Sequence, residues 1–186
     1  VQAQRRSNRA TLYQMDATRL PFVNEFDVIG IFDVLEHVQQ DNAVIASAAA
    51  ALAPRGVLLI TVPQHPWLWS EVDDYSCHYR RYTARGMRTL LSQHGFRVVR
   101  MTSFVSFLLP LMALSRLRHR VRAKPLDPAE ELRVHPVTNR VLAAMMGAER
   151  AIIERGVNLP AGGSLLGRLQ PVPMHRGDAF RSTGRT

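Results

Sequence analysis

The sequence is poor in lysine and in cysteine. Lys124 is its only lysine, so arginine supplies nearly all of the positive charge behind a net charge of +9. We attribute this charge to a compositional preference for arginine, because no aromatic-interleaved basic motif or recognition helix accompanies it. Cys77 stands alone and cannot form an internal disulfide, and no Cys/His cluster has the spacing of a structural zinc site. We therefore expect a cytoplasmic protein without a nucleic-acid partner. A basic nucleic-acid-binding module remains an alternative, and strongly salt-dependent binding would reveal it.

Long hydrophobic runs are also missing. The densest apolar stretch, residues 104–114, is interrupted by Ser106 and Pro110. It is shorter than the roughly 20 residues that cross a bilayer, so we expect no transmembrane helix. The first residues, VQAQRR, contain neither a methionine nor an apolar leader segment. We expect the sequence to begin inside a longer protein.

Short apolar runs alternate with helical patterns in the first hundred residues. Residues 11–15, 26–32, 57–62 and 96–101 are predicted strands, and two of them are almost wholly apolar, as strands of a buried parallel sheet are. Helical spacing predicts one helix capped by Asp41 and another that begins at Thr83 and ends at Gly95. This order favours a parallel α/β sheet with right-handed crossovers.

The pattern changes after residue 103. Two helices are predicted, over residues 104–122 and 138–155, with a Pro-rich linker between them. We divide the chain into a core over residues 1–103, a helical insertion or lid with a possible last strand over residues 104–169, and a disordered tail over residues 170–186.

The candidate functional residues follow the predicted strands. In an open parallel sheet, ligands bind beyond the carboxyl ends of the strands. Asp16 and Ala17 follow the first predicted strand, Phe32 and Asp33 end the second, and His65 follows the third. His65 and His78 are candidate general bases, because histidine titrates near neutral pH, although either one could be an ordinary loop histidine.

Four motifs give these positions a more definite meaning. The segments DATRLPF (16–22), FDVI (26–29), DVLEHV (33–38) and LAPRGV (52–57) stand in this order. Together they resemble class I S-adenosylmethionine-dependent methyltransferases, especially the ubiquinone-biosynthesis branch, over residues 10–105. The resemblance implies a Rossmann-like sheet, S-adenosylmethionine as cofactor, and methyl transfer to a small or lipid-like acceptor.

The same resemblance assigns roles to individual residues. It implies that Asp16 contacts the adenine amine, that the Ala17 backbone faces the adenine ring, and that Phe32 and Asp33 line the methionine end of the cofactor. His37 would pack under the cofactor. Asp16 has a simpler alternative, in which it only caps a turn with Thr18 and Arg19.

The sequence departs from this family in two places. It contains no glycine-rich turn and no acidic residue after a second strand, so the resemblance implies a partial sheet without its first two strands. The strand at residues 11–15 would then either pair directly with the strand at 26–32 or leave that strand with an unpaired edge. Residues 166–171 are polar and contain Pro171, where the family has an apolar last strand.

These departures leave a second hypothesis open. The chain alone would bind S-adenosylmethionine weakly and be inactive, or it would be a non-catalytic fragment that serves as an interaction surface. Asp33, Glu36 and His37 also resemble the metal-binding set of a related RNA-methylating family. Asp33 is shorter than the expected glutamate and no second paired histidine motif is present, so we expect no metal.

The helix at residues 104–122 has two interpretations. Its apolar residues are followed by several arginines, a composition that also occurs in helices that lie on membranes and contact lipid-like substrates. The alternative is a lid packed on the domain, which we favour. Peripheral membrane contact therefore stays a hypothesis about the partners of this chain.

Overall fold

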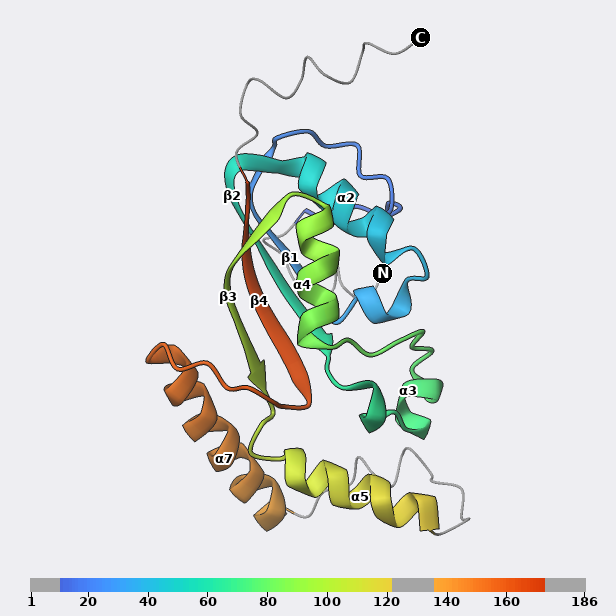
Figure 1. Ribbon diagram of the computed structural model, residues 1–186, viewed down its shortest axis with the longest axis vertical. Coiled ribbons are helices and arrows are strands. Elements are labelled where there is room, and N and C mark those ends of the chain that lie inside the picture. The colour runs from blue at the N-terminus through green and yellow to red at the C-terminus, as the bar shows by residue number, and fades with distance from the viewer. Residues whose placement is uncertain (1–10, 122–135, 173–186) are drawn as a thin grey trace.

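A four-stranded mixed sheet forms the centre of the protein. The computed structural model describes residues 11–121 and 136–172. The strand order is β1-β2-β4-β3, with β1 parallel to β2 and with β4 antiparallel to both of its neighbours (Figure 1). The strands are β1 (Phe26–Phe32), β2 (Leu52–Pro63), β3 (Phe96–Phe104) and β4 (Ser164–Pro171).

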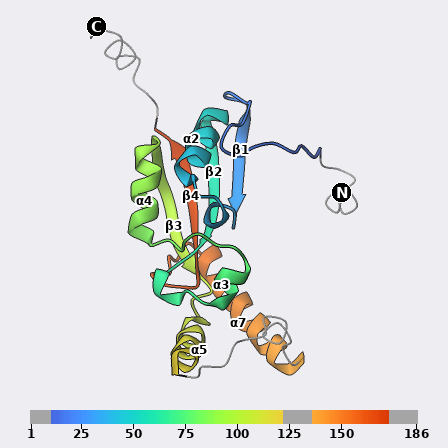
Figure 2. The same cartoon turned by 90° about the vertical axis from the view of Figure 1, so that its right-hand side faces the viewer.

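Helices cover one face of this sheet. Helices α2 and α4 lie side by side on the same face, and α5 and α7 lie beyond one end of the strands (Figures 1 and 2). Ile45 of α2, Leu91 of α4 and Leu58 of β2 are completely buried between these layers. The helices are η1 (Leu35–His37), α2 (Asp41–Ala51), η2 (Pro66–Leu68), α3 (Glu71–Tyr75), α4 (Ala84–Gln93), α5 (Leu109–Val121) and α7 (Pro136–Glu154).

The two predicted crossover helices form largely as expected. The Thr83 hydroxyl accepts a hydrogen bond of 3.0 Å from the Gly86 N–H, which confirms Thr83 as the cap of α4. Gly95 has a φ of 74° just after this helix, a conformation that glycine adopts without strain. The cap predicted for α2 is wrong: Gln40 is the N-cap, and Asp41 is the first helical residue.

The strand predicted at residues 11–15 is not formed. This segment is exposed and forms no strand, because a strand needs a neighbour for its backbone groups and no described strand pairs with it. The outer edge of β1 is therefore open within the described part of the chain. Val28 and Phe32 of β1 are 57% and 55% exposed. Among the described strands, β1 has an unpaired edge, which is the second of the two arrangements considered above.

The last strand forms despite its polar sequence. Strand β4 lies between β2 and β3, where Leu165 and Leu169 are buried while Arg168 points to solvent. Pro171 ends the strand, where its missing N–H costs little. Gln170 and Pro171 therefore belong to the sheet, and residues 173–186 lie outside the described part of the chain.

A buried carboxylate joins the two end helices. Glu149 of α7 is 0% exposed, and its Oε2 accepts hydrogen bonds of 2.8 and 2.9 Å from the N–H groups of Ser106 and Phe107, just before α5. This contact satisfies backbone donors that would otherwise be lost at the start of the helix. In the described ranges, no helix is long and apolar enough to cross a membrane.

Substitutions at Gly147 and Gly162 test how the chain packs around α5 and α7. A Cβ at Gly162 would collide with the carbonyl oxygen of Phe104, whereas a Cβ at Gly147, on α7, would meet nothing within 4 Å. We expect Gly162→Ala to destabilise the fold by about 2 kcal/mol through steric strain. Gly147→Ala should stabilise it by about 0.5 kcal/mol through lower chain entropy. Urea unfolding measures both changes, and equal effects of the two variants would contradict this packing.

Candidate functional site

The site lies where the parallel strands β1 and β2 end. Asp33 and His65 follow these strands, and both have a positive φ, of 51° and 63°, which is unusual for residues other than glycine. The Asp33 N–H donates to the Thr61 carbonyl oxygen at 3.0 Å, and the Thr61 hydroxyl donates to Asp33 Oδ1 at 3.1 Å. Strained backbone of this kind is common at functional sites.

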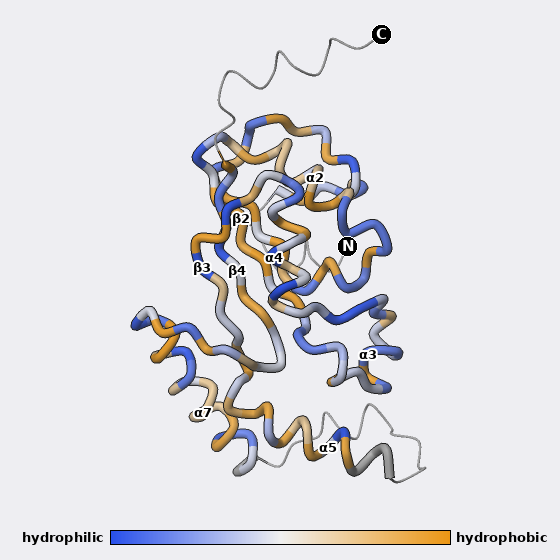
Figure 3. The backbone as a smooth tube through the Cα atoms, viewed as in Figure 1, coloured by the Kyte–Doolittle hydropathy of each residue, from blue (hydrophilic) through white to orange (hydrophobic). Residues whose placement is uncertain are grey.

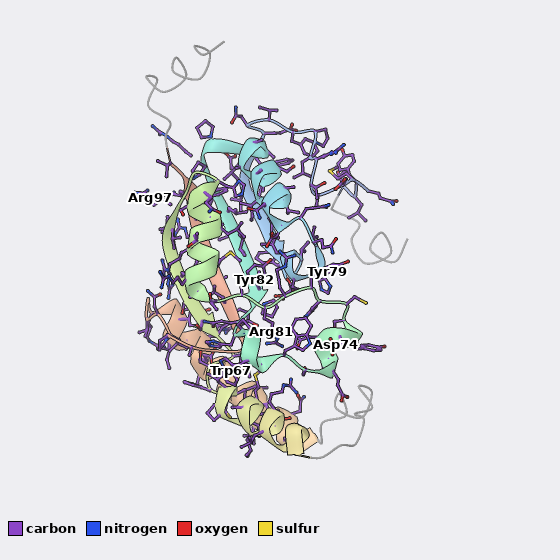
Figure 4. All side chains as sticks on the ribbon, turned by 45° about the vertical axis from the view of Figure 1, so that its right-hand side comes forward. Trp67, Asp74, Tyr79, Arg81, Tyr82 and Arg97 are labelled. Carbon is purple, nitrogen blue, oxygen red and sulfur yellow. The ribbon has the colours of Figure 1, made fainter. Side chains whose placement is uncertain are left out.

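A loop segment, residues 79–82, is hydrogen-bonded across both strand ends. The Tyr79 N–H donates to the Glu36 carbonyl oxygen at 2.7 Å, beyond β1. The Tyr82 N–H donates to the Pro63 carbonyl oxygen, and the His65 N–H donates to the Tyr82 carbonyl oxygen, both at 2.9 Å. Figure 4 shows Tyr79, Arg81 and Tyr82 in this region. These bonds bring the sequence around His78 to the ends of β1 and β2.

Asp41 fixes the same loop from the side of α2. Its Oδ2 accepts a hydrogen bond of 2.9 Å from the Tyr82 hydroxyl and forms an ion pair with Arg80 at 2.7 Å. Burial and then the bond to Asp41 raise the pKa of the Tyr82 hydroxyl well above its usual range. Tyr82 therefore stays protonated and acts as a structural donor, not as a base.

Asp73 is the buried centre of the site. Its side chain is 1% exposed, and its Oδ1 lies 2.9 Å from His78 Nδ1 and 2.8 Å from Arg81 Nε. The other oxygen accepts hydrogen bonds from the N–H and hydroxyl of Ser70 at 2.9 and 3.1 Å. Every lone pair that this carboxylate offers is thus directed at a donor.

These donors keep Asp73 ionised. Burial raises the pKa of Asp73, but the hydrogen bonds from Arg81, His78 and Ser70 outweigh it, so that the net pKa is lowered. An ionised carboxylate can only accept hydrogen bonds, so His78 must carry a proton on Nδ1. Nε2 of a neutral His78 is then an acceptor with a free lone pair, which is the arrangement of a general base oriented by a carboxylate.

Glu36 and His37 adjoin His78. The rings of His37 and His78 meet edge to face, with centroids 4.6 Å apart. Glu36 is 1% exposed, and its burial, with Asp33 contributing less, raises its pKa, although a backbone hydrogen bond acts in the opposite direction. Ligand-type atoms of Glu36, His37 and His78 lie within 4.8 Å of one another, so this group has the composition to bind a cation. The expectation of no metal stays a prediction.

Phe32 and Asp33 present an open surface beside this cluster. A Cβ on Gly30 would lie 2.6 Å from Cε2 of the Phe32 ring, so any other residue at this position would make the ring move. The ring is 55% exposed and offers a flat apolar face. Such a face fits the apolar part of a nucleoside or sulfonium ligand.

Asp16 and Ala17 occupy a turn before β1. Asp16 Oδ1 accepts from the Thr18 N–H and hydroxyl at 2.8 and 2.7 Å, and these bonds, the hydroxyl first, lower its pKa. The Arg19 N–H also donates to the Asp16 carbonyl oxygen, so the turn-capping alternative is realised. These contacts leave Oδ2 as a further acceptor. Ala17 packs against the core, and the contacts of the described residues do not join this turn to the His78 cluster.

His65 and His78 have different surroundings. His65 Nε2 is buried without a hydrogen-bond partner, and burial followed by the charge of Arg81 lowers the pKa of His65. Arg81 reaches towards this turn, since its Nη1 donates to the Gln64 carbonyl oxygen at 3.2 Å. No carboxylate orients the His65 ring among the described contacts. The structure thus gives His78 a carboxylate partner and, among the described contacts, gives His65 none.

Sequence reasoning did not single out Asp73 or Gly30. One signal was readable, because Ser70 and Asp73 have the spacing of a capping box, and the structure confirms this box at the start of α3. Nothing in the sequence ties Asp73 to His78 or Arg81. Those contacts depend on how the loop folds over the strand ends.

Comparison with known proteins decides the family. A family model described as a methyltransferase domain matches residues 2–101. The chain belongs to this family. No curated protein matches it at a significant level.

Solved structures share the methyltransferase fold at low sequence identity. The [4+2]-cyclase SpnF has a TM-score of 0.52 and 20% identity over 92% of this chain and 62% of its own. A putative sarcosine dimethylglycine methyltransferase from Galdieria sulphuraria has a TM-score of 0.54 and 17% identity over 92% of this chain and 64% of its own. An S-adenosylmethionine-dependent methyltransferase from Mesorhizobium loti has a TM-score of 0.53 and 14% identity, over 90% and 73%. The chain thus spans less than two thirds of the first two proteins.

Asp73 should be important for stability as well as position. We expect Asp73→Asn to destabilise the methyltransferase domain by about 3 kcal/mol, because it leaves the buried Arg81 without its counter-ion. Asp74→Asn is the control, since Asp74 is exposed and accepts one hydrogen bond from Trp69 Nε1. That change should cost less than about 0.5 kcal/mol. Chemical unfolding measures both values, and equal losses would contradict the role of Asp73.

The pH dependence of the Asp73 effect follows from its lowered pKa. A carboxylate whose pKa is lowered by folding stabilises the folded state at pH values above its ordinary pKa of 3.8. This stabilisation is lost as the pH falls through the lower pKa of the folded state. The difference in unfolding free energy between the wild type and Asp73→Asn should therefore be constant from pH 7 to about pH 5 and narrow below about pH 4. A difference that narrowed between pH 7 and 6 would point to a histidine instead.

Proposed function

We propose that this methyltransferase domain transfers a methyl group from S-adenosylmethionine to a small or lipid-like acceptor, with His78 as the general base. The Asp73–His78 pair at the ends of β1 and β2 carries the proposal. A base fixed at the ligand-binding edge of a methyltransferase sheet has a direct use, because hydroxyl acceptors must lose a proton. The motifs at residues 16–57 support placement in the ubiquinone-biosynthesis branch.

The described residues fit one side of the cofactor. Phe32 offers an exposed apolar ring, which Gly30 makes room for, and Asp16 Oδ2 offers an acceptor suited to an exocyclic amine. S-adenosylmethionine, when bound, supplies an electrophilic methyl group on a sulfonium centre. Asp33 stands at the end of β1 with its backbone fixed by Thr61, so its carboxylate would contribute negative charge near a cationic ligand.

His78 and its partners would act on the acceptor. Asp73 holds the proton on His78 Nδ1, and Nε2 would take the proton from the acceptor hydroxyl as its oxygen bonds the methyl carbon and the bond from that carbon to the sulfonium sulfur breaks, with S-adenosylhomocysteine as the leaving group. Asp73 stays ionised through this step and stabilises the protonated imidazole. Trp67 and Trp69, which are 48% and 36% exposed, stand on the loop between β2 and α3 and provide apolar surface for an acceptor. Most of the rate would come from alignment of the two reactants.

Binding of the cofactor tests the proposal directly. The described residues include no glycine-rich turn and no acidic residue that would bind the ribose hydroxyls. We therefore expect the 186-residue chain to bind S-adenosylmethionine with a Kd weaker than about 100 μM, because each missing hydrogen bond costs about 1 kcal/mol. Calorimetric titration measures this Kd. Low-micromolar binding would contradict the expectation, and no binding even at millimolar concentration would favour a non-catalytic interaction module.

Turnover tests the role of His78. In a form of the protein that shows methyl transfer, His78→Ala should lower kcat by about 100-fold or more, with the cofactor Kd nearly unchanged. His65→Ala is the matched control and should change kcat by less than about threefold. Activity should also survive a chelator. Loss of activity with chelator and its recovery with Mg²⁺ or Mn²⁺ would contradict the general-base role, because His78 would then serve as a metal ligand.

A further inference from the structure

The turn between β3 and α5 is strained. Val105 has a φ of 60°, in the left-handed region that a β-branched residue rarely adopts. The turn is also crowded, because a Cβ on Gly163 would lie only 3.3 Å from the Cβ of Val105. Such a conformation is unfavourable by itself and persists where neighbouring contacts enforce it. A different backbone conformation at Val105 would relieve the strain and would change the direction in which α5 leaves the sheet.

Three hydrogen bonds enforce this turn. The Gly163 N–H donates to the Val105 carbonyl oxygen at 3.3 Å. Glu149 Oε2 accepts from the N–H groups of Ser106 and Phe107 at 2.8 and 2.9 Å. Glu149 is completely buried, yet its Oε1 has no hydrogen-bond partner among the described residues, and the same is true of the buried Ser106 Oγ. Because a buried polar atom without a partner is unfavourable, these contacts hold the turn at a cost.

Farther along, α5 is less well packed than at its start. The main element against which it packs is η2, where Arg116 Nε donates to the Leu68 carbonyl oxygen at 3.2 Å. A cavity of about 260 Å³ lies beside this contact and is lined by Trp67, Ala113, Arg116 and Leu117. Figure 3 shows α5 beyond the end of the sheet, with the turn that follows β3 next to α7. Weak packing at the middle of a helix offers little resistance to a rotation about its first turn.

We propose that α5 is a lid, that Val105 is its hinge, and that Glu149 is the latch that holds the lid closed. In the open position, Val105 adopts an extended conformation, which suits a β-branched residue. The N–H groups of Ser106 and Phe107 and the Glu149 carboxylate then bind water, and the cavity beside Ala113 widens. Strain and the unsatisfied Oε1 favour opening, whereas the latch hydrogen bonds favour closure, so the two positions are close in free energy. The proposal does not depend on cofactor binding or on methyl transfer.

The hinge is joined to the candidate site by a single residue. Gly163, whose N–H binds Val105, accepts at its carbonyl oxygen a hydrogen bond of 2.9 Å from the N–H of Gln64, which directly follows β2. On the opposite side of the cavity from α5, the ring of Trp67 lies 5.5 Å from the ring of His65, measured between centroids. Opening of the lid would therefore change access to the surface beside the end of β2.

Thiol labelling with N-ethylmaleimide measures opening of the hinge. In a Cys77→Ser background, S106C places a thiol where a buried hydroxyl has no hydrogen bond to lose. A48C is the matched reference, because Ala48 of α2 is 1% exposed and a thiol there reacts only on global unfolding. Under native conditions, S106C should react at least about tenfold faster than A48C. A113C, on the cavity side of α5, reports whether the helix moves with the turn.

Variants of the latch and the hinge should change labelling in opposite directions. E149A should speed labelling of S106C and A113C by about tenfold or more relative to A48C, because it removes the latch. E154A removes an exposed carboxylate from the same helix and should leave the ratio unchanged. V105G should slow labelling by about threefold or more, because glycine adopts this φ without strain. V99G, at an exposed valine of β3 without a positive φ, should not slow it.

Three results would overturn the proposal. The first is labelling of S106C that parallels labelling of A48C in every variant, since the turn would then open only on global unfolding. The second is faster labelling in V105G, as an unstrained valine would give. The third is a change at S106C without a change at A113C, which would mean local fraying without movement of α5. Circular dichroism checks that each variant is folded, and V105G decides the question alone if E149A is not.

Discussion

The hydrogen bonds between residues 79–82 and the strand ends hold the candidate site together. Two of them extend β2 by pairing Tyr82 with Pro63 and His65, and a third joins Tyr79 to Glu36 beyond β1. Backbone bonds of this kind fix a loop without using its side chains. The side chains of Arg80, Arg81 and Tyr82 are then free to bind two buried carboxylates, Asp41 and Asp73. His78 gains its position from this arrangement.

The donors that stabilise the buried carboxylate of Asp73 also orient His78. Burying a charge is unfavourable unless donors surround it, and Asp73 receives donors from His78, Arg81 and Ser70. The same donors determine which nitrogen of His78 holds its proton. Glu36 differs, because its Oε2 is buried without a partner and its pKa is raised mainly by burial. The site thus combines one satisfied and one unsatisfied acid within a short distance, a contrast typical of sites that handle protons or ligands.

Much of the fold was readable from the sequence, because local patterns control strands and helix ends. The strands at β1, β2 and β3 and the cap of α4 follow from apolar runs and from Thr83. Residues 11–15 have the same local pattern as a strand but find no neighbour, which no local pattern can reveal. Strand β4 shows the opposite case, because its polar sequence does not indicate a buried strand. It forms because two strands flank it and only Leu165, Gly167 and Leu169 need to be buried.

The site was predicted less completely than the fold. Phe32, Asp33, His37 and His78 follow from motifs and strand ends, but the choice between His65 and His78 depends on Asp73, which contacts His78 from the neighbouring short helix. The role of Gly30 could not be predicted either, because it depends on where the Phe32 ring lies. Such pairings arise from the three-dimensional path of loops, and loops have weak sequence patterns.

The position of the proton on the His78 ring decides whether Nε2 can act as a base, and NMR of the histidine rings measures that position most directly. Long-range proton–nitrogen spectra of the neutral ring should show His78 with its proton on Nδ1 and a lone pair on Nε2, with the signal moving when millimolar S-adenosylhomocysteine is added. The Asp73→Asn variant should lose this preference. A proton on Nε2 of wild-type His78, or a ring signal that the cofactor product leaves unmoved, would contradict the assignment of the base to this position.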